Sequence, residues 1–147
     1  MRKEPVNSPA SFEVLREQGC LVLVSASEPE RTAPGPERIA IDRLVAFANA
    51  GADCLYAPGV RDPEIIARIV KEVAPKPVNV FVSAPWITVA QLADLGVRRV
   101  SVGGALARAA WGGFIRAARE LAEKGTFESF QSAAGHSELN DFFGTRP

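Results

Sequence analysis

The segment DCLYAPGVRDPEIIARIVKEVAP, residues 53–75, contains a complete strand–loop–helix unit. Residues 53–58 form a short apolar run that ends in small residues, which is typical of a buried strand. Asp62 can cap the helix that follows, and Pro63 suits its first position, so we predict a helix that ends before Pro75. Units of this kind, repeated along a chain, predict a parallel sheet with helical crossovers.

The same alternation continues on both sides of this unit. Further strands are predicted at residues 20–26, 77–84 and 97–104, and further helices at residues 36–51, 88–96 and 105–125. The nearly continuous apolar run from Leu21 to Val24 favours parallel strands that are buried on both faces. The chain is therefore predicted to be an α/β protein with four βα units. These units fit either an open doubly wound sheet or one arc of a (β/α)8 barrel, since a whole barrel needs about 250 residues.

The composition limits the classes of partner. The chain has 147 residues, with 17 basic and 17 acidic side chains, so no overall charge attracts it to nucleic acid or to an anionic membrane. Residues 1–14 lack the apolar core of a signal peptide, and no later run approaches the roughly 18 apolar residues of a membrane span. Cys20 and Cys54 lie in apolar stretches and are expected to be buried thiols. We expect a cytoplasmic protein that binds neither nucleic acid nor membrane.

Several segments together resemble one known family. They are AFANAGADCLYAPGVRDPEII (46–66), KPVNVFVSAP (76–85), TVAQLADLGVRRVSVGGALARAAWGGFIRAARELAEKGTF (88–127) and ELNDFF (138–143). They resemble the C-terminal half of the isocitrate lyase/phosphoenolpyruvate mutase family, and most of all its PEP mutase-like, carboxyvinyl-carboxyphosphonate phosphorylmutase-like branch. The resemblance implies half of a TIM (β/α)8 barrel, strands five to eight, with C-terminal helices.

The resemblance also implies a division of the chain and an activity. Residues 1–19 would be a leader and helix remnant, residues 20–125 the four βα units, and residues 126–147 a helical tail. Members of the family cleave or form C–C or P–C bonds next to a carboxylate, using Mg²⁺. Their metal-binding acids and flexible catalytic loop come from the first four strands, for which this sequence shows no counterpart. We therefore expect a truncated chain that is inactive alone.

The end of the first predicted strand departs from the family pattern. Strand five of relatives typically ends in A-R-x-E, whereas this chain reads Ser25-Ala26-Ser27-Glu28. Ala26 takes the place of an arginine that would clamp a substrate carboxylate through two parallel hydrogen bonds. Glu28 is kept and is the predicted catalytic residue.

A magnesium site needs several oxygen ligands, usually including one or two carboxylates. Asp62 is better explained as a helix cap, and Asp53 is predicted to lie at the wrong end of its strand. Only Glu28 remains, so we predict no metal ligands and expect that Mg²⁺, the cofactor of the family, is not bound by this chain alone.

Substrate contacts are expected at the carboxyl ends of the strands, where barrel enzymes place their sites. Besides Glu28, the candidates at strand ends are Tyr56, Pro58, Gly59, Ser83, Gly103 and Gly104. Asn79 is predicted to point into the barrel. The glycine pair opens a helix and could offer backbone N–H groups to an anion, or could allow close packing of strand and helix. Arg98 and Arg99 are interpreted as a solvated rim.

An arc of four parallel strands leaves two edges unpaired, so a partner is expected. That partner would be a second copy in a homo-oligomer or a separate N-terminal half. The first functional hypothesis is a lyase or mutase acting on a small 2-oxo or hydroxy carboxylate once the other half is present. The alternative is a non-catalytic, truncated or pseudoenzyme domain that acts through oligomerisation. A third hypothesis, a phosphate-sugar-binding barrel, rests only on the glycine pair.

Overall fold

The computed structural model describes residues 23–25 and 36–144, which belong to two compact units. The first unit, Met1–Gly103, is called the sheet unit, and the second, Gly104–Pro147, is called the helical unit. Each is described by itself. The predicted catalytic residue, Glu28, lies outside the described residues, as do Cys20 and Ala26.

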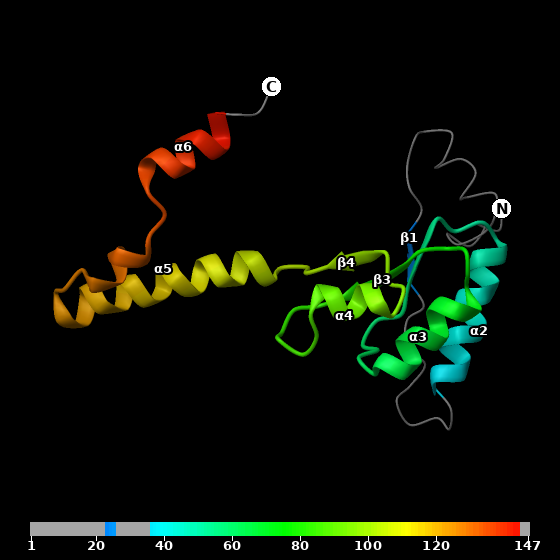
Figure 1. Cartoon of the computed structure of the whole chain (residues 1–147). Helices are drawn as coiled ribbons and strands as arrows, with labels where there is room; N and C mark the ends of the chain where they lie inside the picture. The colour runs from blue at the N-terminus through cyan, green and yellow to red at the C-terminus, as the bar shows by residue number, and fades with distance from the viewer. Residues whose placement is uncertain (1–22, 26–35, 145–147) are drawn as a thin grey trace, which may run out of the picture. The chain divides into compact units, whose positions relative to one another are not determined.

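The sheet unit alternates strands and helices. Its elements are β1 (Leu23–Ser25), α2 (Pro36–Asn49), β2 (Cys54–Tyr56), α3 (Pro63–Glu72), β3 (Val78–Phe81), α4 (Val89–Asp94) and β4 (Arg99–Ser101). The strands form one parallel sheet in the order β1-β2-β3-β4 (Figure 1). The predicted α/β class with a parallel sheet is confirmed, although each strand is shorter than the apolar run that predicted it.

Capping side chains determine where two of the helices begin. The Asp62 carboxylate accepts hydrogen bonds from the backbone N–H groups of Glu64 (2.8 Å) and Ile65 (3.4 Å), and Pro63 is the first residue of α3. Thr88 caps α4 through a reciprocal pair of hydrogen bonds with Gln91. These side chains supply the partners that the first turn of a helix lacks.

The three helices that the structure describes in the sheet unit contribute to a core on the same face of the sheet. One cluster joins Leu44 of α2 and Ile69 of α3 to Leu55 and Val78 of the sheet. A second cluster joins Ile66, Val80, Leu92 and Val97. A doubly wound sheet would carry helices on both faces, whereas sequential strands with helices on one face are the arrangement of a (β/α)8 barrel.

Side chains alternate along a strand, so the residues between these core positions lie on the other face. We call this the polar face, and its described side chains are those of Cys54, Tyr56, Asn79, Phe81, Arg99 and Ser101. The register agrees, because Tyr56 pairs with Asn79, Asn79 with Arg99, and Phe81 with Ser101. The polar face carries the groups that could perform chemistry.

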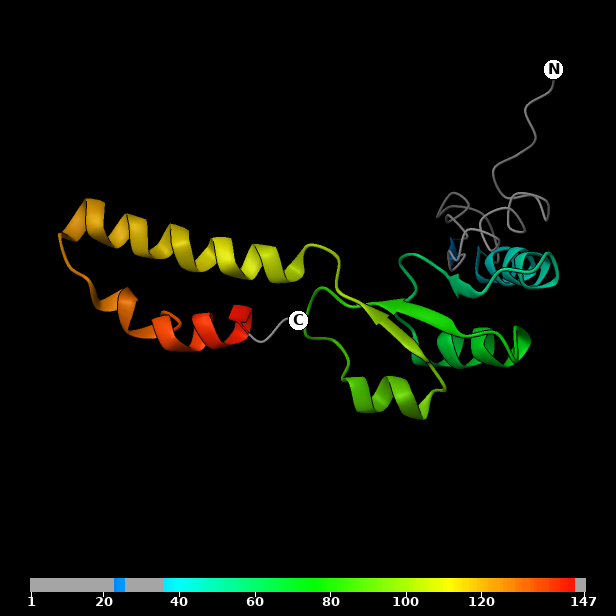
Figure 2. The same ribbon diagram turned by 90° about the horizontal axis from the view of Figure 1, so that it is seen from above.

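The helical unit consists of α5 (Ala105–Lys124), the 3₁₀ helix η1 (Glu128–Ser132) and α6 (His136–Gly144). Gly125, in a left-handed conformation with φ 66°, ends α5, and the chain then reverses direction (Figure 2). Considered by itself, this unit exposes many large apolar side chains, among them Leu106, Trp111, Phe114, Phe127 and Phe142. Among the described helices of the chain, none is long and apolar enough to span a membrane.

Candidate functional site

An open depression of about 270 Å³ lies at the carboxyl end of β2. It is lined by Tyr56, Ala57, Pro58, Gly59, Val60, Arg61 and Phe81. The structure thus brings together three predicted site residues, Tyr56, Pro58 and Gly59. Arg61 and Phe81 were not predicted; the signal for Phe81 was its position at the end of the neighbouring strand.

Local sequence explains the shape of the loop that lines this depression. Gly59 has a φ of 81°, a conformation that residues with a Cβ rarely adopt. Three residues later, Asp62 fixes the start of α3 and so the end of the loop. Partial burial raises the pKa of the Tyr56 phenol further above neutral pH, where its protonated hydroxyl can donate a hydrogen bond.

A hydrogen-bonded cluster occupies the polar face where β3 and β4 pair. Asn79 is only 2% exposed; its side-chain Nδ2 donates to the Ser101 hydroxyl over 3.0 Å. The Nη1 of Arg99 donates to Asn79 Oδ1 over 2.7 Å. Asn79 therefore lies on the face opposite the helices. Arg99, which the sequence placed in a solvated rim, is exposed, and the hydrogen bond to Asn79 adds a partner that the sequence did not reveal. Two adjacent arginines look alike in a sequence, and only the strand register separates them.

Cys54 shares this face. Its thiol is partly buried, and burial raises its pKa, while the positive charge of Arg99 and a hydrogen bond to the Leu55 carbonyl oppose that shift. The protonated thiol favours the predicted role of Cys54 as a packing residue.

The two glycines after β4 differ from each other. Gly103 has a φ of 51°, and a Cβ added there would lie 2.8 Å from Cε2 of the Phe81 ring. Gly104 has a φ of −82° and no atom within 4 Å of an added Cβ. Close packing against Phe81 accounts for Gly103, which lies in the sheet unit, whereas Gly104 caps α5 in the helical unit.

The described residues do not fit a metal ion. Within residues 23–25 and 36–144, no three His, Cys, Asp or Glu side chains lie close enough together to hold one. Asp62 is engaged as a helix cap. The role predicted for Glu28 stays a prediction.

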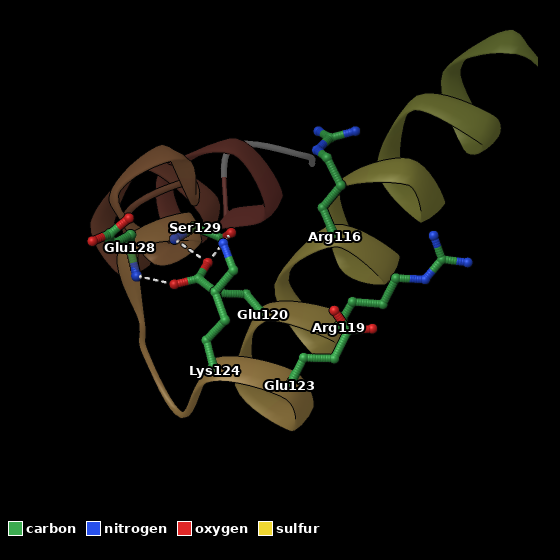
Figure 3. A pocket seen from close by; sticks show the side chains of 7 residues that line it. All are labelled: Arg116, Arg119, Glu120, Glu123, Lys124, Glu128 and Ser129. Carbon is green, nitrogen blue, oxygen red and sulfur yellow. Dashed lines mark hydrogen bonds between the residues drawn. The ribbon is translucent and has the colours of Figure 1, made fainter.

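A separate depression of about 510 Å³ lies in the helical unit, and charged side chains line it (Figure 3). Glu120 explains it. Its carboxylate accepts hydrogen bonds from the backbone N–H groups of Glu128 (2.7 Å) and Ser129 (2.8 Å) and from the hydroxyls of Thr126 and Ser129. These bonds, those of the side chains first, lower the pKa of Glu120 to about 2. We interpret this cluster as the attachment of η1 to α5.

Comparisons with known proteins agree with the alternation of parallel strands and helices described above. The family model of phosphoenolpyruvate phosphomutase matches residues 16–122. The chain belongs to this family. A crystal structure titled "putative lyase/mutase", from Burkholderia cenocepacia J2315, is 39% identical with a TM-score of 0.79, over 93% of this chain and 50% of that chain.

Two further proteins show how much of this member of the phosphoenolpyruvate phosphomutase family is shared with others in sequence and in fold. The structure of 2,3-dimethylmalate lyase, a PEP mutase/isocitrate lyase superfamily member, has a TM-score of 0.70 over 93% of this chain and 49% of its own, but at 19% identity it supports the fold alone. An uncharacterised protein of Mycobacterium tuberculosis is 40% identical over 63 residues, 43% of this chain and 24% of that protein. The chain spans about half the length of the solved relatives.

Proposed function

We propose that this chain supplies strands five to eight of a (β/α)8 barrel in a lyase or mutase that acts on C–C or P–C bonds of small 2-oxo or hydroxy carboxylates. The observation that carries the proposal is the depression at the carboxyl end of β2, next to a polar face with an exposed guanidinium. Carboxyl ends of barrel strands are where such enzymes place their chemistry. Family membership supports the reaction class.

The proposal divides the work between two halves of a barrel. The described half offers groups that hold an anion: the Tyr56 hydroxyl, Arg61, and the Asn79–Arg99 pair. Mg²⁺, which would stabilise negative charge that develops on the substrate, requires carboxylates from the other half, with Glu28 as a candidate acid from this chain. The isolated chain is then inactive and acquires activity only when the other half is present.

Complementation tests this proposal. The part of the Burkholderia relative that the match leaves out is produced as a separate polypeptide and mixed with this chain. We expect the complex, and neither component alone, to release a 2-oxo acid from a 2-hydroxy dicarboxylate, with EDTA abolishing turnover. A stoichiometric complex that binds Mg²⁺ and still turns over no small carboxylate would contradict the proposed function.

The second candidate function is a non-catalytic domain that acts through oligomerisation. It is favoured by the exposed apolar side chains of the helical unit, where Trp111 is 61% and Phe114 63% exposed and their rings meet edge to face. We expect a dimer or larger assembly by mass measurement in solution, and dissociation in the double variant Trp111→Ser/Phe114→Ser. Val89→Ser, at an equally exposed position of the sheet unit, is the control. A monomer at all concentrations would refute this candidate.

A further inference from the structure

We propose that Arg99, Asn79 and Ser101 on the polar face form a binding site for a small carboxylate. The inference rests on the proposed function and deepens it, because it names the groups that would recognise the substrate anion. These three residues belong to β3 and β4, and neither Glu28 nor the loop that lines the depression is part of the proposed site.

The hydrogen bonds fix the orientation of all three groups. A guanidinium can only donate, so the atom that Arg99 Nη1 meets at 2.7 Å must be Oδ1 of Asn79. The amide nitrogen of Asn79 then faces the Ser101 hydroxyl at 3.0 Å. Asn79 is buried while Arg99 is exposed, so a fixed amide holds a guanidinium whose remaining N–H groups are accessible.

The hydrogen-bonding capacity left over is chiefly that of donors. Arg99 keeps its other N–H groups, Asn79 keeps its second amide hydrogen, and the Ser101 hydroxyl, which accepts from Asn79, can still donate. Within residues 36–144, no carboxylate forms an ion pair with Arg99, and the only hydrogen bond of its guanidinium there is to Asn79. A positive charge beside three sets of donors is the complement of a carboxylate, which a guanidinium binds through two parallel hydrogen bonds.

Enclosure of this face makes an anion necessary. In the proposed complete barrel, the face opposite the helices would be the interior, and a guanidinium enclosed there without a negative partner would be strongly unfavourable. The partner could be a substrate or an acidic side chain from the rest of the barrel. We favour a substrate carboxylate because Arg99 is held by Asn79 on the inner strand β3, whose neighbours on both sides are strands of this sheet.

A metal-free titration of this chain tests the proposal. Sodium oxalate, a planar dicarboxylate, is added at constant ionic strength while the side-chain amide resonance of Asn79 is followed by NMR. We expect a saturable shift, with the affinity falling about tenfold or more in Arg99→Gln, since a charge-assisted pair is lost. Arg98→Gln is the matched control and should change the affinity less than about twofold, because Arg98 makes no hydrogen bond to Asn79. Equal losses in both variants, or no saturable shift in the original chain, would overturn the proposal.

Two further arms keep the test decisive. Asn79→Asp places a carboxylate beside Arg99 without a change of size; it should compete with oxalate and weaken binding at least about tenfold even if Arg99→Gln does not fold. Because this variant lacks the side-chain amide, its titration follows the backbone amide resonance of Ser101. Unchanged affinity in Asn79→Asp would overturn the site. Inorganic phosphate, which is tetrahedral, should bind more weakly than oxalate, and tighter phosphate binding would refute a carboxylate site. If oxalate binds as expected but the complementation experiment shows no turnover, the proposed enzymatic function is contradicted and the carboxylate site is not.

Discussion

Substitution of Gly103 by alanine perturbs both the backbone conformation of this position and its packing against Phe81, which lines the depression. An alanine in a left-handed conformation costs about 1–2 kcal/mol. Its Cβ would lie 2.8 Å from the Phe81 ring, well inside an ordinary contact distance, so the ring must leave its rotamer at a further cost of about 1 kcal/mol. Alanine also restricts the unfolded chain, which returns about 0.5–1 kcal/mol. We expect Gly103→Ala to lower the free energy of unfolding of the sheet unit by about 1.5 kcal/mol.

Urea unfolding measures this loss if the two units are observed separately. The chain has two tryptophans, Trp86 in the sheet unit and Trp111 in the helical unit. In a Trp111→Phe background, the fluorescence of the partly buried Trp86 reports the sheet unit alone. Gly104→Ala is the matched control, and it should change the free energy by less than about 0.5 kcal/mol, because an added Cβ meets open space there.

Two results would refute the reasoning about Gly103. A neutral Gly103→Ala variant would mean that neither the left-handed backbone nor the Phe81 ring constrains this position. Equal losses at Gly103 and Gly104 would mean that the pair acts as a unit, as an anion-binding turn would, and that close packing against Phe81 is not the reason for the first glycine.

The remaining predictions concern single side chains. Asp62→Ala should lower the free energy of unfolding of the sheet unit by about 1 kcal/mol and Asp62→Asn by only a few tenths, because asparagine caps helices equally well; equal losses would argue against the cap. The pKa of Glu120 is depressed when folded, so its contribution is present above pH 4.5 and is lost as the pH falls toward about 2. Amide protection at Glu128 and Ser129 should decline in that window and should not do so in Glu120→Gln; an identical decline in the variant would refute the assignment. The pKa of Cys54 is raised by burial, so the sheet unit should lose stability as the pH rises above 9.0, the ordinary value, and Cys54→Ser should remove that part of the slope; an unchanged slope would contradict it.

Local signals predicted the secondary structure because they act within a few residues. Asp62 and Pro63 mark the start of a helix in the sequence, and both do so in the structure. The α/β class followed from the alternation of such segments, and membership of the family followed from the order of several segments together.

The candidate site was less predictable because it depends on strand register. The sequence could not separate Arg99, which bonds to Asn79, from Arg98, because neither alternation nor charge distinguishes two arginines at the start of a strand. Phe81 looked like an ordinary strand residue until its neighbours across β2 and β4 were known. Likewise, Gly103 and Gly104 look equivalent until the backbone angle of each is seen. The roles of the predicted site residues stay predictions.

The affinity of the isolated chain for oxalate, measured by calorimetry with and without Mg²⁺, tests most directly the claim that this half of the barrel holds the anion and the other half holds the metal. We expect weak binding that Mg²⁺ changes by less than about twofold, because residues 23–25 and 36–144 bring together no group of carboxylates that could hold the ion. An increase of about tenfold or more on addition of Mg²⁺ to this chain alone would show that it carries a metal site of its own and would contradict the account.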